Sequence, residues 1–163
     1  MKRFAVVLVL ASMTGCKESA PPGQKDIVAG AFPAEQTEVE GTLRDLLDAA
    51  QKKEVDRLLG FVADSPKVTK FDDSAPLDRQ DVTTWKRAER EAFSAFKSFT
   101  PVISDLKVDV FGSVAVATFI LNYDIETDKD KLSARARSTL VFAKDASRWK
   151  VVHAHFSAFK SNL

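Results

Sequence analysis

The chain has 163 residues, of which 45% are hydrophobic and 29% charged, and its 24 Lys and Arg against 23 Asp and Glu give a formal net charge of +1. This composition excludes a disordered chain and argues against a nucleic-acid-binding surface, which needs a clustered excess of basic residues. A single Cys cannot form an internal disulfide or a thiolate zinc site, so we expect one domain held together by an apolar core.

The first sixteen residues are typical of an export signal. Lys2 and Arg3 form a short basic start, and an unbroken apolar run covers residues 4–11. This run is too short to cross a hydrocarbon core of about 30 Å as a helix, but it has the length of a secretory hydrophobic region. The Met-Thr-Gly-Cys sequence that ends at Cys16 resembles the bacterial lipoprotein signal, in which small residues precede a cysteine that becomes lipidated.

The resemblance to lipoproteins implies a signal peptide at residues 1–15 and membrane lipid attached to Cys16. The protein would then be exported and anchored in the cell envelope. Lys17 stands where inner-membrane retention uses Asp, which implies the periplasmic side of the outer membrane in a Gram-negative cell. An ordinary signal peptide is the alternative. Residues 16–34 are rich in Pro and Gly and predict a flexible tether ahead of a domain at residues 35–163.

Apolar residues at helical spacing predict three helices in the first half of this domain. The first begins at Glu35, the second has its apolar residues at 55–62 and ends before Pro66, and the third covers residues 81–99 and is stopped by Pro101. The apolar stripe of the third helix comprises Trp85, Ala88, Ala92, Phe96 and Phe99. A weakly alternating segment at 67–71 predicts one short strand before the third helix.

After Pro101 the pattern changes to strands. Alternation predicts them at residues 102–111, 114–125, 132–143 and 149–158. Short turns between them indicate an antiparallel meander, and helices ahead of a stranded half indicate an α+β fold. Both faces of the strand at 114–125 are apolar, so both need a cover. The helices can cover one face, and a second subunit is the simplest cover for the other.

Two histidines on the last strand are candidates for a binding site. Strict alternation places His153 and His155 on one face together with Trp149 and Val151. Three interpretations stay open: a metal pair, for which no third ligand has an obvious spacing; pocket groups that bind an anion; or side chains that form hydrogen bonds within the sheet.

Arg135 and Arg137 share one face of the preceding strand. They could line the mouth of a cavity and hold a carboxylate, or serve as charges that protect the sheet from aggregation. Tyr123, the single Tyr, lies on a strand and could face the cavity, and Asp72 and Asp73 are available carboxylates. No set of these residues matches a known catalytic arrangement convincingly, so we assign no catalytic residue.

The last strand closely resembles a known family in the run from Trp149 to Ser157, Trp-Lys-Val-Val-His-Ala-His-Phe-Ser. With the order of the elements, this run is similar to the SnoaL-like branch of the nuclear transport factor 2-like superfamily, which includes the association domain of calcium/calmodulin-dependent kinase. Further marks are Asp56, Phe71 with Asp72, and the Arg-x-Arg-x-Thr run at Arg135. The resemblance implies a cone-shaped barrel in which three N-terminal helices wrap a strongly bent antiparallel sheet around a pocket. It also implies a homodimer through the outer face of the sheet.

The sequence as a whole predicts a lipid-anchored periplasmic module that binds a small anionic or apolar ligand or has an accessory role, with no cofactor, metal or assigned reaction. The alternative is an isomerase, cyclase or hydrolase of a small carbonyl compound. In this superfamily ketosteroid isomerase uses an Asp base with a Tyr and a protonated Asp as oxyanion donors. The predicted pocket residues are His153, His155, Arg135, Arg137, Tyr123 and Trp85.

Overall fold

A computed structural model of the protein describes residues 26–159. The predicted export signal, Cys16 and most of the predicted tether lie outside the described residues. The elements are, in chain order, α1 (Pro33–Gln51), α2 (Val55–Gly60), β1 (Thr69–Phe71), β2 (Gln80–Asp81), α3 (Val82–Ala95), β3 (Ser98–Phe111), β4 (Val114–Glu126), β5 (Lys131–Asp145) and β6 (Arg148–Ala158).

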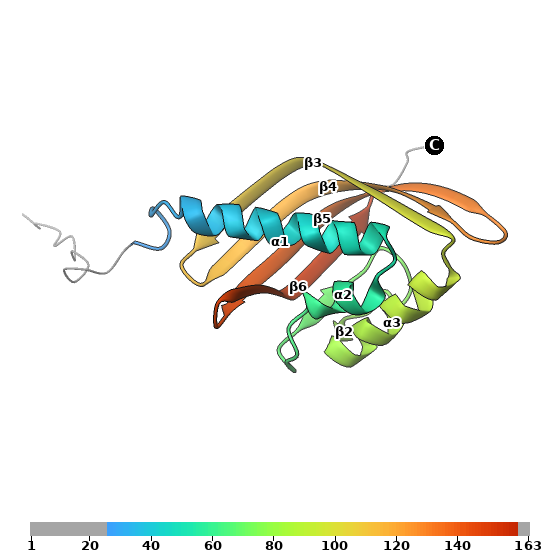
Figure 1. Ribbon diagram of the computed structural model, residues 1–163, viewed down its shortest axis with the longest axis horizontal. Helices are drawn as coiled ribbons and strands as arrows, with labels where there is room; N and C mark the ends of the chain where they lie inside the picture. Colours follow the sequence, from blue (N-terminus) through green and yellow to red (C-terminus); the bar gives the residue numbers. More distant parts are fainter. Residues whose placement is uncertain (1–25, 160–163) are drawn as a thin grey trace, which may run out of the picture.

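These elements form two layers, with the helices on one face of a strongly curved sheet (Figure 1). The sheet order is β2-β1-β6-β5-β4-β3, and β3 to β6 form an antiparallel meander on short turns. The predicted α+β cone is therefore confirmed. The sheet is mixed, however, because the short strand β1 pairs with β6 in parallel.

The N-terminal helix begins at Pro33, two residues earlier than predicted. Proline is favoured in the first turn of a helix, where its missing N–H would have no partner. Just before it, the Asp26 carboxylate accepts hydrogen bonds from the backbone N–H groups of Val28 and Ala29, at 2.9 and 3.0 Å. Of the segment at 16–34 that was predicted as a tether, the described part contains this turn and the first two residues of α1.

The prediction that the third helix reaches Phe99 and is stopped by Pro101 is wrong. Helix α3 ends at Ala95, and both residues belong to β3. Because β3 is an edge strand, a residue without a backbone N–H is tolerated there. At its start, α3 is capped by Asp81, whose carboxylate accepts the backbone N–H of Thr84 at 2.7 Å.

A β-bulge in the last strand changes which side chains face the core. Neighbouring residues of β5 pair with Val151 and His153, which leaves Val152 as an extra residue in β6. Trp149 and Val151 are buried on the helix side, whereas His155 is exposed. The prediction that the two histidines share a face with Trp149 and Val151 is therefore wrong, because one inserted residue reverses the alternation that follows it.

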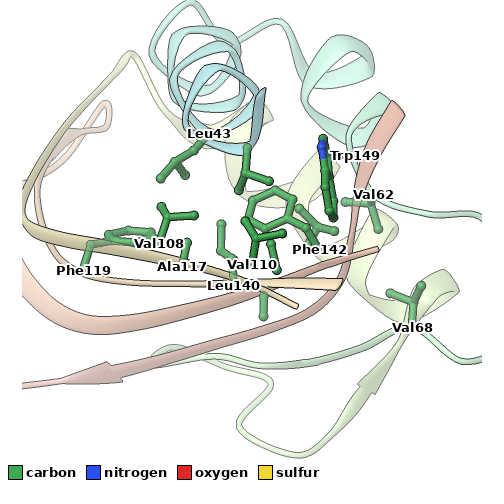
Figure 2. Close-up of a cluster of buried hydrophobic side chains, with 14 of the residues drawn as sticks. Leu43, Val62, Val68, Val108, Val110, Ala117, Phe119, Leu140, Phe142 and Trp149 are labelled. Carbon is green, nitrogen blue, oxygen red and sulfur yellow. The ribbon is translucent and has the colours of Figure 1, made fainter. Parts of the chain in front are cut away.

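The core fills the space between α1 and the concave face of the sheet (Figure 2). Leu43 from the helix meets Phe142 and Val110 from the strands, and Trp149 closes the side towards Val62. Where α1 meets α2 and α3, a smaller apolar cluster adjoins this core. Residues of both clusters line a cavity, which is the candidate site.

Candidate functional site

A cavity of about 200 Å³ lies between the three helices and the concave face of the sheet. Most of its wall is apolar, with side chains from α1, α2, α3, β4 and β6. Its aromatic side chains include Trp85, Phe93, Phe96, Phe99 and Phe119. A dry cavity of about 150 Å³ is enough to hold benzene in another protein, so this one has room for a single ring with a short substituent.

One end of the cavity is charged because β1 turns a lysine inward. Its middle residue, Lys70, points to the concave face and is only 4% exposed. The Lys70 ammonium forms ion pairs with Asp72 and with Glu89, the latter at 2.5 Å. Glu89 also accepts a hydrogen bond from Trp85 Nε1 at 2.9 Å, so the indole fixes the carboxylate that faces the lysine.

The ion pairs keep Lys70 charged. Burial alone lowers the pKa of its ammonium, but the charges of Glu89 and Asp72 outweigh burial and raise the pKa above its ordinary value. A lysine that stays protonated cannot act as an amine nucleophile. Lys70 therefore supplies a fixed positive charge at the end of the cavity.

Beside this ion cluster, Tyr123 and Asp73 form a second polar pair. The Tyr123 hydroxyl donates a hydrogen bond to the Asp73 carboxyl at 3.1 Å. Burial, and then a hydrogen bond with Asp72, raise the pKa of Asp73, and burial followed by the Asp73 charge raises that of Tyr123. A carboxyl at the wall of a cavity whose pKa is raised can take a proton from a bound molecule or give one to it.

Of the six residues predicted for the pocket, the structure places two at this cavity. Tyr123 lines the polar end, and Trp85 lies in the wall next to Glu89. The other four lie on the opposite, outer face of the sheet, so the six predicted residues do not surround one cavity.

On that outer face, the two histidines contact strand β1. Thr69 Oγ1 and His153 Nδ1 share a hydrogen bond at 2.9 Å. The ring of Phe71 lies 6.3 Å from that of His153 and 5.8 Å from that of His155. Burial, and then the nearby His155, lower the pKa of His153. This arrangement is the hydrogen bonding within the sheet that was one of the three interpretations left open by the sequence.

Both arginines contact the end of the described chain. The guanidinium carbons of Arg135 and Arg137 lie 4.5 and 5.1 Å from the centre of the Phe159 ring. Arg135 also borders a shallow depression of the outer face, together with Thr100 and Asn122. The arginines and the histidines thus belong to a surface that the curved sheet separates from the cavity.

The charged end of the cavity was not predicted, although the sequence contains a signal for it. Glu89 lies four residues after Trp85 and four residues before Phe93, so a carboxylate lies in the middle of the apolar stripe of α3. A charge on a buried face needs a partner of opposite charge. Lys70, the central residue of the short strand β1, is that partner.

Two further observations apply to residues 26–159. No helix among them is both long and apolar enough to cross a membrane. Nor do these residues contain a group of three or more His, Cys, Asp and Glu side chains arranged to hold a metal ion.

Comparison with known proteins gives a family match and several similar folds. The family model of the SnoaL-like domain matches residues 39–160. No curated protein matches the sequence. Among solved structures, a nuclear transport factor 2-like protein of unknown function from Pseudomonas putida is similar with a TM-score of 0.70 at 16% identity, over 82% of this chain and 92% of that one.

Two other solved structures are similar over most of their length. One, from Streptomyces avermitilis, is provisionally assigned as a dehydratase of the nuclear transport factor 2-like family; its TM-score is 0.71 at 14% identity, over 78% of this chain and 98% of that one. The other is the CaMKII hub of S. rosetta, with a TM-score of 0.61 at 25% identity, over 80% of this chain and 99% of that one.

Proposed function

This chain belongs to the SnoaL-like domain family, and we propose that it is a binding module that holds a small, largely apolar molecule with one polar group inside its cone. The observation that carries the proposal is the cavity of about 200 Å³, which has aromatic walls and a single charged end. Burying the apolar part of a ligand contributes about 25 cal/mol for each Å² removed from water. The groups at the charged end would orient the polar part, as a few polar groups do in most ligand pockets.

Native mass spectrometry of the chain purified from its own host tests this proposal. We expect the wild-type protein to retain a small molecule. Ala92 lines the cavity, so Ala92→Phe should fill part of it and abolish retention. Ala95 is exposed on the same helix, and Ala95→Phe is the matched control that should leave retention unchanged. Wild-type protein that carries no small molecule, with the Phe variants indistinguishable from it, would contradict the proposal.

A second candidate function, an enzyme acting on a small carbonyl compound, is favoured by the pair of Asp73 and Tyr123. Asp73 could take a proton from the carbon next to a carbonyl group. The Tyr123 hydroxyl, which donates to Asp73 in the free protein, would then donate its hydrogen bond to the oxygen that becomes negative. The provisional dehydratase assignment of the Streptomyces avermitilis relative supports this candidate. The test is the exchange of those carbon-bound protons in a small enone, cyclohex-2-enone, in D₂O. Exchange should require Asp73 and be lost in Asp73→Asn, and equal rates in both proteins would exclude this role.

We also propose that the protein is anchored by lipid on Cys16 in the cell envelope, on the periplasmic side of the outer membrane if the host is Gram-negative. Support comes from the basic start, the apolar run and the small residues that precede this cysteine. Labelled palmitate should enter the wild-type protein and not the Cys16→Ser variant, which should leave the membrane fraction. Equal labelling of both proteins would contradict the anchor.

A homodimer through the outer face of the sheet is the last part of the proposal. Val116, Ile120 and Val141 lie on this face beside Val102, which is 58% exposed. The likeness to a CaMKII hub supports an assembling domain. In sedimentation equilibrium we expect a dimer that Ile120→Lys dissociates and that Ala95→Lys, on the helix side, leaves intact. A wild-type monomer at all concentrations would exclude the dimer.

A further inference from the structure

We infer that the cavity is selective for a protonated amine, whose apolar part lies among the phenylalanines and whose ammonium group contacts Asp73. This inference rests on the proposed function, since it names the class of ligand for the same cavity. The sequence left an anionic or an apolar ligand open, and the anionic alternative depended on the histidines and arginines. Those four side chains lie on the other face of the sheet and cannot contact a molecule in the cavity.

The charge balance of the cavity wall is the first argument. Among the described residues that line it, the charged side chains are three carboxylates, Asp72, Asp73 and Glu89, and one cation, Lys70. Lys70 is already paired with two of the three carboxylates. A ligand carboxylate would add a like charge to a half-buried site, whereas an ammonium group would balance the excess.

The position of Asp73 is the second argument. Its carboxyl accepts the Tyr123 hydroxyl at 3.1 Å, and within residues 26–159 it takes part in no ion pair. The titratable groups around it are Asp72 beside it, Lys70 on β1, Glu89 on α3 and Tyr123 on β4. Burial and Asp72 raise its pKa, and a bound cation would lower it again by stabilising the ionised form.

The aromatic wall that leads to Asp73 is the third argument. Phe93 lies 5.4 Å from Phe96 and 5.5 Å from Phe99, and Phe99 lies 5.8 Å from Tyr123, measured between ring centres. Aromatic faces attract organic cations. The Lys70 ammonium already shows this in the same cavity, since it lies 5.5 Å from the ring centre of Trp85. An amine with an apolar body would contact rings along its length and a carboxylate at its end.

Three matched compounds test the inference by calorimetry on the purified chain at neutral pH. They are 2-phenylethylamine, 2-phenylethanol and phenylacetate, which share a ring and differ in charge. We expect the amine to bind about tenfold or more tightly than the alcohol, because a hydrogen bond to a charged group is the stronger one, and phenylacetate to bind weakest. The same titrations at lower pH should show weaker binding of the amine and unchanged binding of the alcohol, because protonation of Asp73 removes the charge that holds the ammonium group.

Two variants locate the effect. Asp73→Asn should reduce the affinity for the amine about tenfold and leave that for the alcohol unchanged, whereas Asp109→Asn, an exposed-face carboxylate paired with Lys107, should change neither. Alcohol or phenylacetate that binds as tightly as the amine would overturn the amine inference and leave the binding function standing. If none of the three compounds binds, the amine inference is also overturned. The binding function is tested separately, by whether native mass spectrometry finds a retained molecule.

Discussion

Replacing Lys70 by Met should destabilise the protein far more than removing an ordinary ion pair. Lys70 is 4% exposed, and the side chains of its partners Asp72 and Glu89 are 17% and 18% exposed. Methionine fills most of the lysine volume but leaves two half-buried carboxylates facing each other without a cation. Breaking a buried pair in this way costs about 3–5 kcal/mol of the free energy of unfolding.

The assay is urea denaturation followed by circular dichroism, which gives the free energy of unfolding of each variant. Lys86→Met is the matched control, because Lys86 pairs with Asp64 at 3.0 Å where Asp64 is 90% exposed. That exposed pair is worth at most about 1 kcal/mol. In the double variant Lys70→Met with Glu89→Gln, one carboxylate is neutral, so part of the lost stability should return. Equal losses for Lys70→Met and Lys86→Met would refute the argument that the cavity end is a buried ion cluster.

The remaining predictions concern the core and the titration of the site. Phe142→Ala should cost about 3–5 kcal/mol in the same assay, since Phe142 is fully buried, whereas Phe71→Ala on the outer face should cost clearly less. Asp73→Asn should be more stable than the wild-type protein at neutral pH, because the pKa of Asp73 is raised in the folded state. The contribution of Asp73 to the free energy of unfolding is therefore complete below the unfolded pKa of 3.8 and is lost as the pH rises through the raised pKa. The gain from Asn should therefore vanish in acid, and a gain that is equal at all pH values would contradict the raised pKa. Tyr123→Phe should raise the pKa of Asp73 further in an NMR titration, because the hydroxyl that it removes stabilises the carboxylate.

The sequence was sufficient for the order of the elements, except for the two-residue strand β2, because that order depends on local patterns. Alternation from Val114 onward predicted β4, and helical spacing around Trp85 predicted α3, each from side chains within a few residues. The end of α3 was placed too late because Phe96 and Phe99 also fit the helical stripe. Their contacts with Phe93 are real, but they are made after the chain has left the helix.

The site was less predictable because its geometry depends on one residue in β6. Val151 and Val152 are both apolar, so the sequence does not reveal which of them is the extra residue or that one is present. Without the bulge, His153 and His155 would face the cavity, as strict alternation predicted. With it, Ala154 and Phe156 face inward, and the charge of the cavity comes from β1 and α3.

The inward charge of β1 also explains how so short a strand is held. β1 has three residues, and its main chain pairs with β6 on one side and with two residues of β2 on the other. The ion pair of Lys70 with Glu89 ties this strand to α3 across the cavity, so the sheet edge and the cavity wall depend on the same contact. A ligand that drew Glu89 or Asp72 away from Lys70 would therefore loosen the sheet edge and destabilise the folded protein. Asp73 forms no ion pair with Lys70, since its carboxyl accepts the Tyr123 hydroxyl and lies beside Asp72, so a ligand can engage it without taking a carboxylate from the lysine.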